Sequence, residues 1–253
     1  MSSIAVLIIL CAIAIGSLVT VSVINQRELK AKHIRQKLKQ LKLKVEELEE
    51  LVINLDQLVE SRTIPKVIND EIIDIVTAML EQNKSAHYLE ATLINARTRS
   101  EELSEYGGHR NICRLKDSDA QIARAQHCLG EAGRLIRAQH SNGCITLAEM
   151  ETFISELSWT YLMVDVVSHI GQGHKAINRG DILTAHAFYK KAQQSLIQSP
   201  HPDPRRHRMI KEVGEILQNK RKALNLDLMP ENFYNPPEST ASAEADVSAE
   251  ATL

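Results

Sequence analysis

The feature that most constrains this chain is an apolar segment close to its N-terminus. Residues 4–24 form a run of 21 residues without a charge, and 13 of them are Leu, Ile or Val. A helix of that length extends roughly 32 Å, which is enough to cross the hydrocarbon core of a bilayer. A secretory signal has a basic start and a shorter apolar stretch. We therefore expect one uncleaved transmembrane helix, preceded by a short external N-terminus, 1–3.

The charges that follow this segment predict its orientation. Residues 25–44 contain eight Lys or Arg and one Glu. The positive-inside rule places such a flank in the cytoplasm, so we expect a plasma-membrane protein, in the inner membrane of a bacterium, with a cytoplasmic C-terminal domain. The four basic residues nearest the bilayer are placed to contact anionic lipid headgroups: Arg27, Lys30, Lys32 and Arg35. Nucleic-acid contact is the alternative use of this cluster.

Residues 25–62 combine the basic segment with a heptad pattern. Apolar residues alternate four and three apart, as in the seam of a left-handed coiled coil: Ile34, Leu38, Leu41, Val45, Leu48, Val52, Leu55 and Val59. Their branching mostly matches the preference of parallel dimers, which predicts a dimeric stalk that ends at Ile64-Pro65. The alternative is an amphipathic helix packed on its own domain, which Leu51 and Leu58 would suit.

Residues 63–229 are predicted to form an all-α domain, built as a helical bundle or a stack of hairpins. We find no period-two alternation with turn punctuation, but helix-start signals recur. They predict helices that begin at 119, 147 and 204. The signals are two capping boxes and one cap followed by proline: Ser118 with Gln121, Thr146 with Glu149, and Asp203 with Pro204.

Small and aromatic residues recur within 166–199, and Arg179-Gly180-Asp181 has the composition of a turn. The recurring residues are Gly173, Gly180, Ala185, Tyr189 and Ala192. This pattern resembles one helical hairpin of the tetratricopeptide repeat family, although His169 and Gln172 occupy its usual Trp and Leu positions. The resemblance implies a peptide-binding groove on the first helix, lined by Ile170, His174, Ile177 and Asn178. A generic helix pair with small contact residues is the alternative.

Composition changes in the last segment, 230–253. It contains no Lys or Arg and is rich in Glu, Ser, Ala, Thr and Pro, which is typical of a disordered acidic tail. The whole chain has a net charge of −2 and 4% aromatic residues. These values disfavour nucleic-acid binding, which uses basic surfaces and stacking platforms. A nucleic acid would have to use the basic juxtamembrane segment and the basic residues between 205 and 222.

No motif specifies a reaction. Asp165 and His169 have the helical spacing of an oriented general base. They also fall on a polar stripe opposite an apolar one, so we interpret them as the solvated face of an amphipathic helix.

Two His-Cys pairs are spaced for zinc on one helix face, His109 with Cys113 and His140 with Cys144. The helix predicted between them would hold the pairs roughly 30 Å apart. We therefore predict no metal, no cofactor and no catalytic residue.

Together these features predict a binding function and no catalysed reaction. We expect a membrane-anchored scaffold or adaptor that forms a homodimer and binds an unidentified cytoplasmic protein near the bilayer. The alternative is a membrane-tethered factor that binds nucleic acid or a chromosome. An enzyme is the interpretation with least support.

Overall fold

The computed structural model describes residues 3–82, 87–105 and 112–237, without the side chains of 3–21, 23, 24 and 31. These ranges form seven α-helices and one 3₁₀ helix, with no strand, which confirms the predicted all-α class. The elements are α1 (Ser3–Leu58), α2 (Thr63–Gln82), α3 (His87–Ser104), α4 (Asp119–Ser141), α5 (Leu147–Asn178), α6 (Ile182–Gln198), α7 (Pro204–Leu217) and η1 (Pro230–Phe233).

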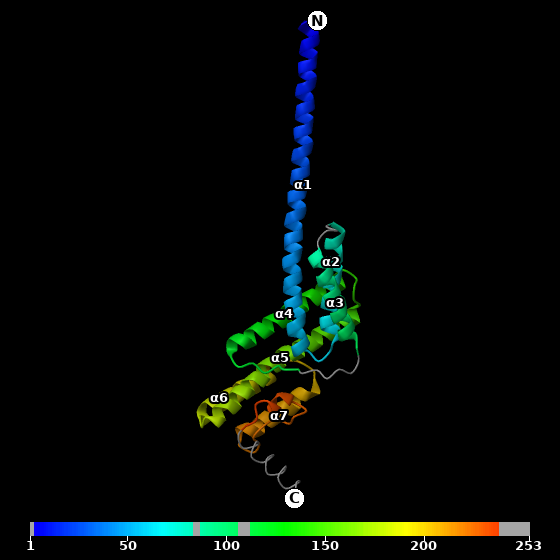
Figure 1. The fold of residues 1–253 in the computed structure, drawn as a ribbon. Coiled ribbons are helices and arrows are strands. Elements are labelled where there is room, and N and C mark those ends of the chain that lie inside the picture. Colours follow the sequence, from blue (N-terminus) through cyan, green and yellow to red (C-terminus); the bar gives the residue numbers. More distant parts are fainter. Residues whose placement is uncertain (1–2, 83–86, 106–111, 238–253) are drawn as a thin grey trace.

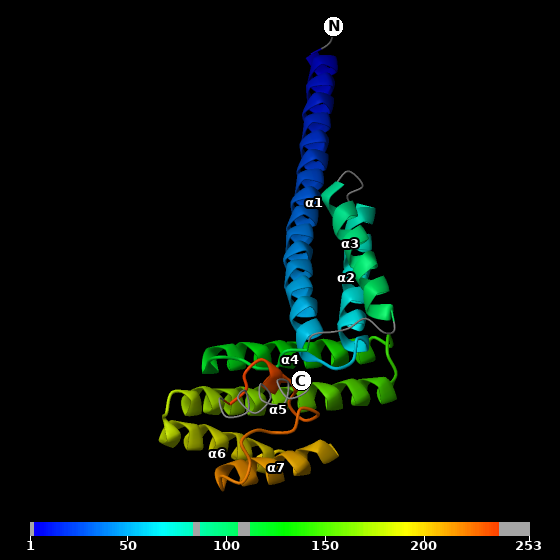
Figure 2. The ribbon, with the colours of Figure 1, turned by 60° about the horizontal axis from the view of Figure 1, so that its bottom comes forward.

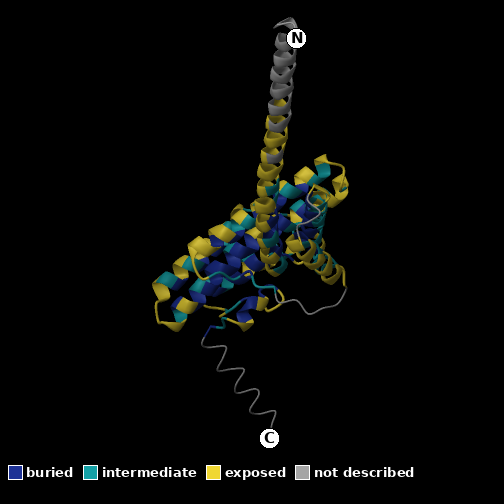
Figure 3. Ribbon diagram, turned by 45° about the horizontal axis from the view of Figure 1, so that its top comes forward, coloured by how far each residue is buried: buried dark blue, intermediate teal, exposed yellow. Residues whose placement is uncertain are grey.

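The helices lie in two groups that cross each other. Helices α1, α2 and α3 run along one direction, and α4 to α7 are stacked across it (Figures 1 and 2). Helix α1 is the longest element, and its N-terminal half projects beyond all the others (Figure 1). Helix α5 packs between α4 and α6, and α7 packs on α6. Buried residues gather where the two groups meet (Figure 3).

Helix α5 belongs to both hydrophobic clusters of the core. Phe153, Leu157 and Val164 pack with α1 to α4, and most of the buried residues from Trp159 onward pack with α6, α7 and the segment 224–229. The predicted division into a polar and an apolar stripe holds in the first turns, where Ser155 is exposed and Leu157 is buried, but fails beyond them. His169, which was predicted to lie on the solvated face, is 1% exposed. The physical reason is that from Trp159 onward neighbours cover α5 on nearly every side.

The three predicted helix starts are confirmed. The Ser118 hydroxyl accepts a hydrogen bond from the Gln121 amide, and α4 begins at the next residue. Thr146 and Glu149 form a reciprocal capping box at the start of α5. The Asp203 carboxylate caps α7, whose first residue is the expected proline. Each cap satisfies amide donors that the first helical turn leaves without a partner.

The corner between α1 and α2 differs from the predicted stop. Helix α1 ends at Leu58, before the expected Ile64-Pro65, and α2 begins at Thr63. Pro65 therefore lies in the first turn of α2, where a missing amide donor costs no helical hydrogen bond. Ile64 and Pro65 are both buried, so the corner is part of the core.

The C-terminal part of the heptad seam packs on the chain's own domain. The seam residues from Val45 to Val59 are all buried, together with Leu51 and Leu58, and they share a cluster with α2 and α4. This arrangement corresponds to the alternative of an amphipathic helix covered by its own domain. Ile34, farther towards the N-terminus, is 44% exposed. Leu38 and Leu41 are partly buried against the same cluster, so Ile34 is the described seam residue that is most accessible to a second copy.

Helices α5 and α6 form the antiparallel hairpin expected at 166–199. Gly180 has a φ of +80° in the turn, a conformation that glycine adopts without strain, and the Asp181 carboxylate caps α6. The two helices approach closely at Gly173. A Cβ placed there would lie 2.8 Å from Cδ1 of Tyr189, so the tyrosine ring occupies the space that a side chain would need.

The predicted acidic tail, 230–253, begins with residues that have a defined structure. Pro230–Phe233 form η1, in which Glu231 and Asn232 are buried, whereas Phe233 and Tyr234 are exposed. Asn232 also donates a 2.7 Å hydrogen bond to the carbonyl of Leu224. The rest of the predicted tail, 238–253, lies outside the described residues.

Within the residues that were described fully, no helix is both long and apolar enough to cross a bilayer. The predicted span 4–24 lies outside that finding, because nearly all of its side chains are outside the described residues.

A pair of glycine substitutions tests the contact between α5 and α6. We expect Gly173→Ala to lower the free energy of unfolding by about 1–3 kcal/mol, because its Cβ overlaps the Tyr189 ring. Gly130→Ala in α4, where nothing lies within 4 Å, should instead raise it by about 0.5–1 kcal/mol. Chemical denaturation of both full-length variants in detergent measures the two changes. Equal effects would contradict the packing of Tyr189 on Gly173.

Candidate functional site

The four residues predicted to line a partner groove on α5 differ in accessibility. Ile170 and His174 are buried, Ile177 is partly buried and Asn178 is exposed. The chain itself covers part of this face with residues 233–237, which we call the C-terminal strap. The structure therefore brings these residues to one face, but the strap lies on that face.

Three hydrogen bonds join the strap to α5. The Asn235 side-chain amide donates to the carbonyl of Gly171 over 2.9 Å. The imidazole of His174 contacts the Asn235 carbonyl through Nδ1 over 3.1 Å, and the Asn178 amide donates to the carbonyl of Pro236 over 3.3 Å. A carbonyl only accepts hydrogen bonds, so Nδ1 of His174 carries the proton.

Burial determines the charge of His174. Desolvation lowers the pKa of its imidazole from 6.5 to about 4, although the hydrogen bond to Asn235 opposes that shift. The ring is therefore neutral at physiological pH. Its Nε2 atom is buried without a hydrogen-bond partner among the described residues, and the ring meets the edge of Tyr189 at 5.9 Å between centroids.

A second concave surface, the α1–α4 groove, lies between α1 and α4 and has a volume of about 1170 Å³. Apolar side chains from both helices and from the segment before α4 line it, including Leu51, Leu115 and Leu135. Cys128 also lines the groove, and burial raises the pKa of its thiol to about 11, so the thiol stays protonated.

The walls of the α1–α4 groove differ in charge. Lys44, Glu47 and Glu50 line it from α1, and Arg124, His127 and Glu131 line it from α4. Lys44 is paired with Glu71, and Glu131 is paired with His127 and Arg134. Glu47, Glu50 and Arg124 make no ion pair with another described residue and are exposed. Among the charges without an ion-pair partner in the described residues, α1 therefore presents two carboxylates and α4 presents one guanidinium, on either side of an apolar surface.

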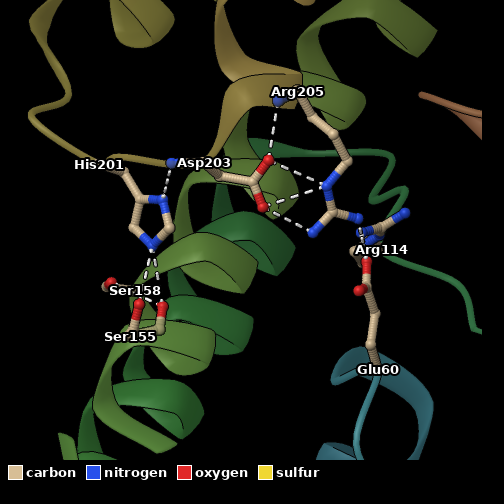
Figure 4. Close-up of polar contacts among 7 residues, drawn as sticks. All are labelled: Glu60, Arg114, Ser155, Ser158, His201, Asp203 and Arg205. Atoms are coloured by element: carbon tan, nitrogen blue, oxygen red, sulfur yellow. Dashed lines mark hydrogen bonds and ion pairs between the residues drawn. The ribbon is translucent and has the colours of Figure 1, made fainter. Parts of the chain in front are cut away.

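A chain of charged groups joins distant segments beside a smaller hollow (Figure 4). Arg205 contacts both Asp203 and Glu60, and Arg114 contacts Glu60 over 3.3 Å and Glu231 over 3.0 Å. The side chains of Arg114 and Glu231 are 7% and 1% exposed. Hydrogen bonds from Arg205 lower the pKa of the Asp203 carboxyl, which therefore stays ionised.

The same hollow contains a serine, a histidine and an aspartate, but they are not arranged for catalysis (Figure 4). The backbone amide of Asp203 donates to Nδ1 of His201, so Nδ1 is unprotonated and Nε2 carries the proton. That Nε2 lies 3.0 Å from the carbonyl of Ser155 and 3.5 Å from its hydroxyl. A general base needs a free nitrogen towards the serine. The Asp203 carboxylate binds Arg205 instead of the imidazole.

Asp165 and His169, the pair with the spacing of a general base, lie together on α5. Nδ1 of His169 is 2.7 Å from the Asp165 carbonyl and 3.5 Å from its carboxylate. Nε2 lies 3.9 Å from Asp119. Because the imidazole is 1% exposed, a substrate atom has no path to it in this conformation.

The two basic regions differ in whether their side chains are paired within the chain. Arg27, Lys30, Lys32 and Arg35 are exposed on the part of α1 that projects beyond the domain (Figure 3). In the region of α7, the arginines are paired within the chain: Arg205 with Asp203 and Glu60, Arg206 with the carbonyls of Leu196 and His201, Arg208 with Asp227, and Arg221 with Glu212 and Glu215.

Among the described residues, no three His, Cys, Asp or Glu side chains come together where they could hold a metal ion. Cys144 is exposed, while Cys113 and Cys128 are partly buried free thiols. His109, one of the residues spaced for zinc, lies outside the described residues.

The α1–α4 groove and the Arg114–Glu231 pair were not predicted. The only sequence signal for the groove was the wide apolar stripe that includes Leu51 and Leu58. Arg114 and Glu231 are 117 residues apart, so no local pattern joins them. No protein-family model, curated protein or solved structure matches this chain.

A neutral replacement of His174 tests the effect of its burial on stability. Folded chains bind this proton only near pH 4, whereas unfolded chains bind it near pH 6.5, so acid favours unfolding. The contribution is fully present above pH 6.5 and is lost as the pH falls towards 4. Between pH 7 and pH 5, we expect the intact chain to lose about 2 kcal/mol more unfolding free energy than His174→Asn does.

Chemical denaturation at the two pH values measures this difference. His207→Asn, at an exposed position of α7, is the matched control and should keep the pH dependence of the intact chain. If His174→Asn kept it too, another group would be responsible.

Proposed function

We propose that this chain is a single-pass, membrane-anchored scaffold that binds a helical segment of a partner protein close to the bilayer. The observation that carries the proposal is the α1–α4 groove, one wall of which belongs to α1. Helix α1 is also the element that continues from the core towards the apolar segment 4–24. The same helix would therefore position the binding surface relative to the membrane.

The proposed anchor is residues 4–24, with the C-terminal domain in the cytoplasm of a bacterial cell. Helix α1 runs unbroken from Ser3 to Leu58, so the exposed residues Arg27, Lys30, Lys32 and Arg35 follow the anchor within about two to three turns. Exposed cations at that depth attract anionic headgroups. A parallel homodimer would use the N-terminal part of the seam, around the exposed Ile34.

The chemistry of the α1–α4 groove defines the partner. Its volume of about 1170 Å³ exceeds the roughly 300–1,000 Å³ of common small-molecule sites, and helices form two of its walls. Such a groove suits the apolar face of an amphipathic helix. The charge of its walls favours a helix with basic residues along the edge that faces Glu47 and Glu50. The opposite edge, facing Arg124 and His127, would be acidic.

Labelling of Cys144 with a membrane-impermeant maleimide tests the topology. This thiol is exposed, whereas the protonated, partly buried Cys128 reacts poorly with maleimides. We expect no labelling in intact spheroplasts and labelling in inverted membrane vesicles. Cys144→Ser should abolish the signal from the vesicles. Labelling in spheroplasts would contradict the proposed orientation, and recovery of the chain without membranes would contradict the anchor.

Site-specific photo-crosslinking tests the binding surface in membranes. A photoreactive side chain at Arg124 should capture one partner, and the captured peptide should map to an amphipathic helix. The same group at Lys190, an exposed residue of α6, is the matched control and should not capture it. Glu47→Lys combined with Glu50→Lys should weaken capture by about tenfold, since like charges would face the basic edge of the helix.

Two results would overturn this assignment. Equal capture from Arg124 and Lys190 would show that the α1–α4 groove is not the binding surface. A product of twice the mass of the chain would show that the groove binds a second copy instead of a partner protein.

A further inference from the structure

The contact between the C-terminal strap and α5 has the chemistry of peptide recognition. The strap presents two consecutive carbonyls, those of Asn235 and Pro236, to the side-chain donors of His174 and Asn178. These two hydrogen bonds recognise the backbone carbonyls of an extended segment and do not depend on its side chains. The Asn235 side chain is also recognised, because its amide donates to the Gly171 carbonyl.

Gly171 makes that side-chain contact possible. A carbonyl within a helix keeps one lone pair free after it accepts the helical hydrogen bond, so it can accept a second donor. A Cβ at Gly171 would lie 3.0 Å from Nδ2 of Asn235 and 2.7 Å from Cδ1 of Leu115. Glycine therefore leaves the room through which the asparagine reaches the helix backbone.

The two prolines of the strap, Pro236 and Pro237, also suit the α5 face. Pro236 and Pro237 have no amide proton, so a segment in which they follow Asn235 brings no further backbone donor against α5. A proline-rich segment is also extended before it binds, which reduces the entropy lost on binding. The α5 face offers donors where such a segment has only acceptors.

The strap and the residues before it are held differently. Met229, Glu231 and Asn232, which precede the strap, are buried, and Glu231 is paired with Arg114. Within the strap, Phe233 and Tyr234 are 75% and 65% exposed, Asn235 and Pro236 are partly buried, and Pro237 alone is buried. Residues with little buried apolar surface open at lower cost than the core does, so the strap can leave without unfolding the residues before it.

We propose that the α5 face formed by Gly171, His174 and Asn178 is a binding site for an extended Asn-Pro-Pro segment, and that the strap is its occupant within the same chain. A partner that carries a proline-rich segment of this chemistry binds there once the strap is displaced. This is a second site beyond the α1–α4 groove, and Leu115 lies against both.

Binding of a strap peptide in trans tests the proposal. The protein is the full chain in detergent micelles, and the probe is a fluorescent peptide with the sequence of residues 232–240. Asn235→Asp in the chain should release the strap, because a carboxylate cannot donate to the Gly171 carbonyl. We expect the peptide to bind this variant at least about tenfold more tightly than it binds the intact chain, whose own strap competes at high effective concentration.

Matched variants separate recognition from charge and from unfolding. Gln194→Glu, which adds a negative charge at an exposed position of α6, should bind the peptide as weakly as the intact chain does. A second substitution, His174→Phe, should remove binding from Asn235→Asp, and a peptide with Asp in place of its second Asn should not bind. A chain that ends at Asn232 keeps Glu231 and offers the same test without a new charge.

The proposal is overturned if the peptide binds neither released chain more tightly than the intact one. It is also overturned if His174→Phe leaves that binding unchanged. Because this experiment uses purified protein and no partner, its failure would leave capture through the α1–α4 groove unaffected, and the failure of that capture would not affect peptide binding.

Discussion

The burial of the C-terminal half of α5, from Trp159 to Ala176, on nearly every side is the constraint on which the rest of the structure depends. A polar side chain on a buried helix needs a partner inside the protein, since an unpaired buried group costs roughly 1–3 kcal/mol. Ser168 contacts the backbone of Arg114 and Lys116, and His174 contacts the backbone of Asn235. These hydrogen bonds hold two non-helical segments, one at Arg114 to Lys116 and one at Asn235, against polar side chains of α5.

Ion pairs then hold these segments to the end of α1. Arg114 lies between Glu60, just after α1, and Glu231 in η1. Removal of one member of a buried pair leaves an uncompensated charge and costs roughly 3–5 kcal/mol, whereas exposed pairs contribute little. The buried Arg114–Glu231 contact therefore does more than the exposed pairs of α7 to fix the C-terminal segment on the domain.

Local signals made part of this structure predictable. The caps at Ser118, Thr146 and Asp203 and the turn at Gly180 depend on residues within four positions of one another, so their sequences contain the whole interaction. The heptad seam was different, because its pattern shows which face of α1 is apolar but not which surface covers it. Composition also misled the prediction for the start of the acidic tail: residues 230–237 are rich in proline, as a disordered tail is, but Glu231 pairs with Arg114 in a distant segment.

The unbroken length of α1 has a geometric consequence. A helix advances about 1.5 Å and turns about 100° with each residue, so residues 3–58 fix both the height of the domain and its rotation about the helix axis. One residue added between 25 and 44 would move the groove by only that small rise but turn it by about 100°. Seven added residues would raise it by about 10 Å and restore nearly the same direction. The direction that the binding surface faces is therefore encoded in the number of residues before it.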